Sequence, residues 1–242
     1  MAVLNGGAKP RVLVVENEEG GGPGQLADAA ADAGLELDVR TAAALPERLG
    51  DAAGLVVLGA SYDVRDAERY PHLFTVMDLL REAADGDRPA LGICLGGQLA
   101  AEALGGRVER APAGPEIGWR AVRATEEAGD DPVAVAAGEG TPMLLWHHDV
   151  FVPPPGATRL LTADGYPEQG FRLGSVWAIQ PHPEADPATL AGWVASPGGA
   201  ADLRANGVTD DDMLGPAPAG SPLARRVLDA WCAVVAATDP PS

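Results

Sequence analysis

A cysteine lies at the point where a short apolar run gives way to an alanine-rich segment. The letters GICLG, residues 92–96, match the pattern G-x-C-x-G around Cys94, which is typical of a nucleophile on a tight turn between a strand and a helix. Such a turn exposes the side chain at the carboxyl edge of a sheet, and the positive end of the following helix favours thiolate over thiol. The pattern alone fits a buried cysteine in a glycine-rich turn equally well.

A thiolate that transfers acyl groups needs a base, and the base needs a group that orients it. Among the four histidines of the chain, His182 is followed two residues later by Glu184. In an extended segment this spacing points both side chains the same way, so Glu184 can orient His182. His-Pro-Glu by itself would be a plain turn, but together with the cysteine motif it predicts a Cys-His-Glu set for nucleophilic catalysis.

Three other features are weaker candidates for chemistry. The pair His147-His148 before Asp149 could suggest a metal site, but neighbouring residues of a strand point apart and no third ligand is placed, so we predict no metal. The glycines of residues 20–24 lack the G-K-[ST] of a phosphate-binding loop and indicate a plain loop. Cys232 lies in an apolar helical stretch, where a packing role is expected.

The first half of the chain must position Cys94. Its apolar runs and helical spacings alternate, which predicts an α/β fold with a doubly wound, mostly parallel sheet and helices on both faces. The expected strands cover residues 11–17, 35–40, 54–58 and 90–94, and the expected helices cover residues 25–33, 69–84 and 95–104.

The second half must position His182. Shorter strands joined by turns predict an antiparallel addition to the sheet, followed by helices, and the Gly, Pro and Asp of residues 207–222 predict a mobile loop. With no internal repeat and no long linker, we expect one domain over residues 1–242, with a core at about 10–195 and a C-terminal helical extension at 196–242. The expected strands cover residues 119–124, 133–136, 143–146, 158–162 and 175–179, and the expected helices cover residues 187–194 and 222–237.

Composition narrows the class of protein. The chain of 242 residues carries a formal net charge of −18, which repels phosphate backbones and anionic lipid heads and argues against nucleic acid or a membrane surface as a partner. Its two cysteines, far apart, do not form a disulfide framework. The N-terminus lacks the apolar core of a secretory signal, and no stretch reaches the roughly 18 apolar residues of a membrane helix. We therefore expect a cytoplasmic protein.

Several motifs together resemble the class I, or triad, glutamine amidotransferases. GICLGGQLAAEALGG around Cys94 and AIQPHPEA around His182 carry the likeness, which runs from RVLVVEN to beyond His182 and includes PEIGW, LLWHHD and YPEQGFRLGSVW. It is strongest to the stand-alone branch that is similar to the glutaminase domain of GMP synthase. The resemblance implies a flavodoxin-like fold with an elbow cysteine.

The reaction of that family, carried over to this chain, is hydrolysis of the side-chain amide of glutamine without a cofactor. Cys94 would attack the amide carbon, His182 would move the thiol proton to the leaving ammonia, and Glu184 would orient His182. Water would then release glutamate from the thioester. The matching motifs imply oxyanion and substrate contacts at Gly59, Ala60, Leu95, Gln98, Trp146 and His147.

The chain departs from the family pattern around the expected pocket. Gly-Ala-Ser at residues 59–61 replaces Gly-Gly-Pro, His148 replaces the glycine of Trp-His-Gly-Asp, and Pro181 replaces an aromatic residue before His-Pro-Glu. These changes leave the triad in place and alter the surroundings of the substrate.

Three functions stay open. The first is a glutaminase that supplies ammonia to a synthetase on another chain, because this sequence contains no ATP-binding half. The second is a γ-glutamyl peptide or amine hydrolase that uses the same triad on a different substrate. The third is a non-catalytic binding protein on the same fold, against which the intact triad counts. Assembly into a homo-oligomer is compatible with each of them.

Overall fold

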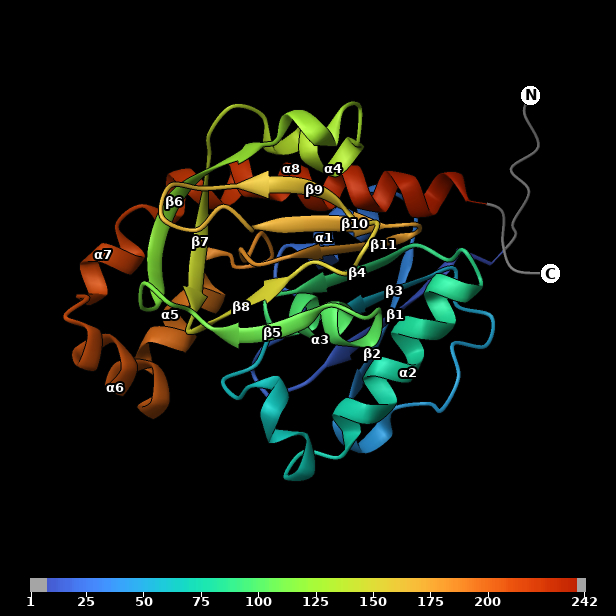
Figure 1. Cartoon of the computed structure of the whole chain (residues 1–242), viewed down its shortest axis with the longest axis horizontal. Coiled ribbons are helices and arrows are strands. Elements are labelled where there is room, and N and C mark those ends of the chain that lie inside the picture. The colour runs from blue at the N-terminus through green and yellow to red at the C-terminus, as the bar shows by residue number, and fades with distance from the viewer. Residues whose placement is uncertain (1–7, 239–242) are drawn as a thin grey trace.

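A computed structural model describes residues 8–238 and shows a nine-stranded sheet at the centre of the molecule (Figure 1). The strand order is β2-β1-β3-β4-β11-β10-β9-β6-β7, and a separate pair joins β5 to β8. The strands are β1 (Arg11–Glu16), β2 (Glu36–Thr41), β3 (Gly54–Val57), β4 (Ala90–Ile93), β5 (Arg107–Arg110), β6 (Glu116–Ala124), β7 (Thr141–His147), β8 (Asp149–Val152), β9 (Thr158–Thr162), β10 (Gly170–Leu173) and β11 (Val176–Ile179).

The sheet has a parallel half and an antiparallel half, as the sequence predicts. Strands β2, β1, β3, β4 and β11 are parallel to one another. Strands β10, β9, β6 and β7 extend this half through antiparallel pairs. Because β4 lies between β3 and β11, the carboxyl ends of these three strands meet at one edge, where open α/β sheets bind ligands.

Helices cover both faces of the sheet and confirm the doubly wound, flavodoxin-like prediction. Along β1, Val12 and Val14 pack into a core with α1, α4 and α8, whereas Leu13 and Val15 pack into a second core with α2 and α3. Figure 1 shows α8 along one face and α2 and α3 against the other. The helices are α1 (Leu26–Asp32), α2 (His72–Asp85), α3 (Leu95–Ala103), α4 (Pro132–Ala137), α5 (Pro187–Ala195), α6 (Pro197–Asn206), α7 (Asp210–Leu214) and α8 (Ala217–Ala237).

Two predictions in the second half are wrong. The expected strand at residues 133–136 is helix α4, because the Asp131 carboxylate caps the N–H groups of Val133 and Ala134 and Pro132 occupies the first turn. The expected mobile loop at 207–222 contains α7 and the start of α8, since Thr209 forms a reciprocal capping box at the start of α7.

Three short strands, β5, β8 and β10, were not expected from the sequence. Each has four residues, too few for a clear alternation of apolar and polar side chains. Between residues 8 and 238, none of the helices is both long enough and apolar enough to span a membrane.

Candidate active site

Cys94 occupies the junction between β4 and α3. Its backbone has φ 51° and ψ −109°, a conformation that residues with side chains adopt at a cost. Strand β4 ends at Ile93 and α3 begins at Leu95, so the sulfur stands at a helix N-terminus. The residue is 6% exposed. The predicted elbow is therefore present, with the strain that such a turn carries.

The glycines around Cys94 let α3 approach the sheet closely. A Cβ atom on Gly96 would collide with the carbonyl oxygen of Val57 in β3, and one on Gly92 would collide with Gly96. A Cβ on Gly97 would lie 2.9 Å from the carbonyl oxygen of Ile179. Any larger residue would push the helix away from the sheet, so these glycines position the turn.

His182 and Glu184 form a buried pair beside the cysteine. The distance from His182 Nδ1 to Glu184 Oε1 is 2.7 Å, and both side chains are almost fully buried. Gly59, just beyond β3, joins this pair to the elbow: a Cβ built there would lie 3.1 Å from His182 Cε1 and 3.5 Å from Cys94 Cβ. The structure thus brings Gly59, Cys94, His182 and Glu184 together from three adjacent strand ends.

The surroundings of His182 favour its protonated form. Burial lowers the pKa of the imidazole, but the charges of Glu184 and Cys94 and the hydrogen bonds to both outweigh burial and raise it to about 10. At neutral pH the imidazole is therefore in its positively charged form, with a proton on each nitrogen, and it lies between the Glu184 carboxylate and the Cys94 sulfur. This arrangement is that of a proton carrier beside a nucleophile.

Two further groups point at the sulfur. Trp146 presents its carbonyl oxygen 3.8 Å from Cys94 Sγ, and Gln180 places its amide Nε2 3.6 Å from the same atom. Gln180 is fully buried, and its Oε1 has no hydrogen-bond partner among the residues described. Sequence reasoning did not single out Gln180, although it stands in the AIQPHPEA motif two residues before His182.

Two of the residues expected to hold the substrate, Gln98 and His147, converge on one backbone carbonyl group, that of Asp149. Gln98 donates from Nε2 to the Asp149 oxygen at 3.1 Å, and His147 Nδ1 lies 3.0 Å from that oxygen. On its other side the His147 ring has Nε2 3.2 Å from the Glu116 carboxylate. Gln98 and His147 therefore support the segment after Trp146 from within, with both side chains buried.

The glycine-rich loop at residues 20–24, for which the sequence predicts no functional role, packs against Glu184. A Cβ on Gly24 would collide with the Glu184 carbonyl, which accepts a hydrogen bond from the Gln25 N–H at 3.0 Å. The Gln25 side chain also donates to the Pro183 carbonyl at 2.7 Å. No sequence signal indicated this contact, because it joins segments that are far apart in the chain.

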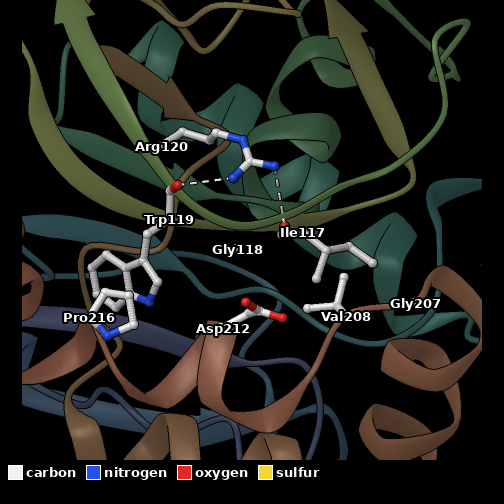
Figure 2. Close-up of a pocket in the computed structure, with 8 residues that line it drawn as sticks. All are labelled: Ile117, Gly118, Trp119, Arg120, Gly207, Val208, Asp212 and Pro216. Atoms are coloured by element: carbon white, nitrogen blue, oxygen red, sulfur yellow. Dashed lines mark hydrogen bonds between the residues drawn. The ribbon is translucent and has the colours of Figure 1, made fainter.

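A separate hollow of about 320 Å³ lies between β6 and the helices near the C-terminus (Figure 2). There Arg120 folds back and donates to the carbonyl oxygens of Trp119 and Ile117 at 3.0 and 3.5 Å. None of the residues predicted to act in catalysis lines this hollow, so it is not the candidate active site. Over residues 8–238, no three His, Cys, Asp or Glu side chains converge as metal ligands would.

Comparison with known families decides the class of protein. The profile of the family Glutamine amidotransferase class-I matches residues 24–192, which include Cys94, His182 and Glu184. The chain belongs to the class I glutamine amidotransferase family. The resemblance in the motifs is thereby confirmed.

Relatives of this amidotransferase include GMP synthase proteins. It is 33% identical over 156 residues to a glutamine-hydrolyzing GMP synthase subunit of Haloarcula marismortui, a match that covers 63% of this chain and 75% of the relative. It is 34% identical over 145 residues to a glutamine-hydrolyzing GMP synthase of Aeropyrum pernix, covering 58% of this chain and 26% of the relative. The chain thus spans about a quarter of the length of the Aeropyrum pernix protein.

A shorter match and a solved structure complete the comparison. The amidotransferase is 38% identical over 64 residues to gamma-glutamyl peptidase 4 of Arabidopsis thaliana, covering 26% of this chain and 25% of the relative. The crystal structure of a glutamine amidotransferase from Thermotoga maritima superposes with a TM-score of 0.86 at 27% identity, covering 95% of this chain and 99% of that one. The GMP synthase-like type and the flavodoxin-like fold are both supported.

Proposed function

We propose that this amidotransferase hydrolyses the side-chain amide of glutamine to glutamate and ammonia, with Cys94 as nucleophile, His182 as proton carrier and Glu184 as the group that orients His182. The observation that supports the proposal is the strained elbow of Cys94 facing a buried His182–Glu184 pair. A protein that only binds a ligand has no need of this strained, charge-paired arrangement.

The reaction follows from the protonation state of the pair. With the proton on His182, the Cys94 thiolate attacks the amide carbonyl carbon and the carbonyl oxygen takes the negative charge. His182 gives its proton to the amide nitrogen, the C–N bond breaks, ammonia leaves and a thioester remains. Water then attacks the thioester while His182 takes one proton from it. The C–S bond breaks, glutamate leaves, and the thiolate–imidazolium pair is restored.

The oxyanion would bind between α3 and the loop after β3. The N–H of Leu95, the first residue of α3, has no partner within the helix and lies at its positive end. The loop at Gly59 and Ala60 would supply a second N–H. Among the residues described, only Asp87 and Cys94 combine a side chain with positive φ, so Ala60 needs no backbone angle reserved for glycine.

The first candidate includes a partner that receives the ammonia. Two relatives are GMP synthase proteins, and the one from Haloarcula marismortui is by name a single subunit of that enzyme. We propose that a synthetase on another chain uses the ammonia released here. In this reaction Gln98 would contact the substrate, and the backbone around Trp146 and His147 would grip the amino-acid end of glutamine.

A second candidate is a γ-glutamyl peptide or amine hydrolase with the same triad. The match to a gamma-glutamyl peptidase and the changed residues Ala60 and His148 favour it. The chemistry is identical, except that a peptide or amine leaves in place of ammonia.

One experiment separates the two candidates. Purified protein and its Cys94→Ala variant are incubated with glutamine and with a panel of γ-glutamyl peptides and amines, and glutamate and ammonia are measured. We expect release from glutamine that disappears in the variant. Cleavage of γ-glutamyl conjugates alone would move the assignment to the second candidate. Absence of all cleavage, with no labelling of Cys94 by an alkylating glutamine analogue, would contradict both.

A further inference from the structure

One carboxylate joins helix α6 to the strand that faces Cys94. Asp202 accepts a hydrogen bond from Trp146 Nε1 at 2.7 Å, and its two oxygens lie 2.9 and 3.0 Å from His148 Nε2. Trp146 and His148 are two residues apart, so both side chains leave the segment on the same face. An ionised carboxylate only accepts, so His148 must carry a proton on Nε2. We refer to Asp202, Trp146 and His148 as the latch.

Few apolar side chains hold α6 in place. Leu203 is its one buried residue, and the helix begins with Pro197, Gly198 and Gly199, of which the glycines lower helix propensity. A short helix with so little apolar burial depends on its polar contacts. Asn206 supports the latch from within α6 by donating to the Asp202 carbonyl and carboxylate at 2.9 and 3.0 Å.

The latch is connected to the candidate active site through two contacts, one to Cys94 and one to His182. The carbonyl oxygen of Trp146 is 3.8 Å from Cys94 Sγ, so the residue whose indole binds Asp202 also faces the nucleophile. Helix α5, which precedes α6 directly, places Trp193 edge-on to His182 with ring centroids 5.1 Å apart. Opening of α6 would therefore disturb the end of β7 that faces Cys94 and the contact of Trp193 with His182.

The latch also explains an unusual residue in the sequence. Position 148 is a histidine where the resemblance leads one to expect glycine. A glycine has no side chain to reach α6, and Asp202 would keep the indole of Trp146 as its donor from this strand. The histidine thus adds a contact that ties the C-terminal helices to the segment next to Cys94.

We infer that Asp202 is a positioning residue: through Trp146 and His148 it holds α6 against the site and keeps the substrate-gripping segment aligned with Cys94. The effect on substrate binding rests on the proposed function. The effect on access to Cys94 rests on geometry alone. The two effects can be measured separately.

The first measurement is steady-state kinetics of Asp202→Ala with the best substrate of the wild-type protein. The latch acts on the segment beside the substrate rather than on the reacting bond, so binding in the ground and transition states weakens together. We expect KM to rise about tenfold while kcat changes by less than about threefold. The variants Asp202→Asn, which keeps the shape, and His148→Gly, which removes one donor, should raise KM by smaller factors.

The second measurement needs no substrate. The rate at which iodoacetamide alkylates Cys94 is followed by mass spectrometry of the Cys94 peptide, and Cys232, fully buried in α8, reports unfolding in the same sample. We expect Asp202→Ala to raise the Cys94 rate several-fold and to leave Cys232 unreactive. The matched control is Asp210→Ala, an exposed acid on α7 with no side-chain hydrogen bond among the residues described.

The outcomes separate the latch from the proposed function. Equal KM values and equal Cys94 rates in Asp202→Ala and Asp210→Ala would overturn the latch. If Cys232 also becomes reactive in Asp202→Ala, that variant unfolds, and the same measurements are made on the isosteric variant Asp202→Asn. A wild-type KM together with a wild-type Cys94 alkylation rate in Asp202→Asn would overturn the inference. If the wild-type protein cleaves no substrate, the proposed function fails, while a faster Cys94 reaction in Asp202→Ala still supports the latch.

Discussion

A buried cysteine lies at the junction between β4 and α3, and another lies in the C-terminal half of α8, yet the two regions give the thiol different surroundings. Cys94 stands at a helix N-terminus with φ 51°, faces the Gln180 amide and interacts with a protonated His182. Cys232 lies inside α8, where burial and the nearby charge of Asp229 raise its pKa to about 12. One thiol lies at a helix start beside a protonated imidazole, whereas burial keeps the other thiol neutral.

Burial alone therefore does not decide what a cysteine can do. Cys94 is 6% exposed and Cys232 is fully buried, a small difference. The decisive differences are the backbone position, at a helix start or in a helix interior, and the charge of the neighbouring side chains. Substitutions at the two cysteines and in the residues that position Cys94 test this contrast.

Exchange of each cysteine for alanine should separate the two regions most strongly. We expect Cys94→Ala to lower kcat/KM for the best substrate by about 10,000-fold or more, because the nucleophile is lost. Cys232→Ala should keep kcat/KM and lower the free energy of unfolding by about 1 kcal/mol, through lost packing. The measurements are product release and denaturant unfolding. A large loss of activity in Cys232→Ala would contradict the packing role of Cys232.

The tight approach of α3 to the sheet should make Gly96→Ala strongly destabilising. The added Cβ would collide with the Val57 carbonyl, so we expect a loss of about 3 kcal/mol or more in the free energy of unfolding. The matched control is Gly192→Ala in α5, where a Cβ meets no atom within 4 Å and should stabilise the helix by about 0.5 kcal/mol. Equal midpoints in urea for the two variants would contradict the expected packing.

The ion pair of His182 and Glu184 should contribute pH-dependent stability. The pKa of His182 is raised to about 10 from an ordinary value of 6.5, so its contribution is fully present below pH 6.5 and is lost as pH rises through 10. We expect Glu184→Gln to lower the free energy of unfolding by about 2 kcal/mol at pH 6. The difference from the wild-type protein should shrink steadily towards pH 10. A difference that is constant across this range would contradict the charge pairing.

Glycine should have opposite effects at the two cysteine positions. At position 94 the positive φ favours glycine, so we expect Cys94→Gly to be about 1 kcal/mol more stable than Cys94→Ala. At position 232 the backbone is in the interior of α8, so Cys232→Gly should be about 1 kcal/mol less stable than Cys232→Ala. Thermal unfolding of the four variants measures both signs. The same sign at both positions would show that the elbow stores no strain.

The first half of the fold was predictable because its signals are local. Apolar runs that end in turn residues mark β1, β3 and β4, and the observed bounds differ from the expected ones by one residue at most. The segment at 133–136 was misjudged because a short apolar run fits a strand and a buried helix equally well. The cap from Asp131 decides in favour of the helix. At 207–222, Thr209 and Asp212 likewise form a cap within a segment whose composition is typical of a loop.

In the candidate site, too, some features follow from local sequence patterns and others arise only from packing. The amino-acid pattern alone indicates that Cys94 follows a strand between glycines and that Glu184 lies two residues after His182, since both patterns are short and local. That the two motifs meet was decided by the parallel pairing of β4 with β11, in which the Cys94 N–H donates to the Ile179 carbonyl at 2.8 Å.

The remaining contacts came from packing alone. Gln180 points at the sulfur, Gly24 fits against Glu184, and Asp202 binds Trp146 and His148. The contacts of Gly24 and Asp202 join segments that no local spacing relates, and the direction of the Gln180 side chain depends on how β11 pairs within the sheet. Local patterns therefore determined which chemistry this chain can offer, whereas the tertiary structure decided which groups surround it, because side chains from distant segments become neighbours only when the sheet and its helices pack.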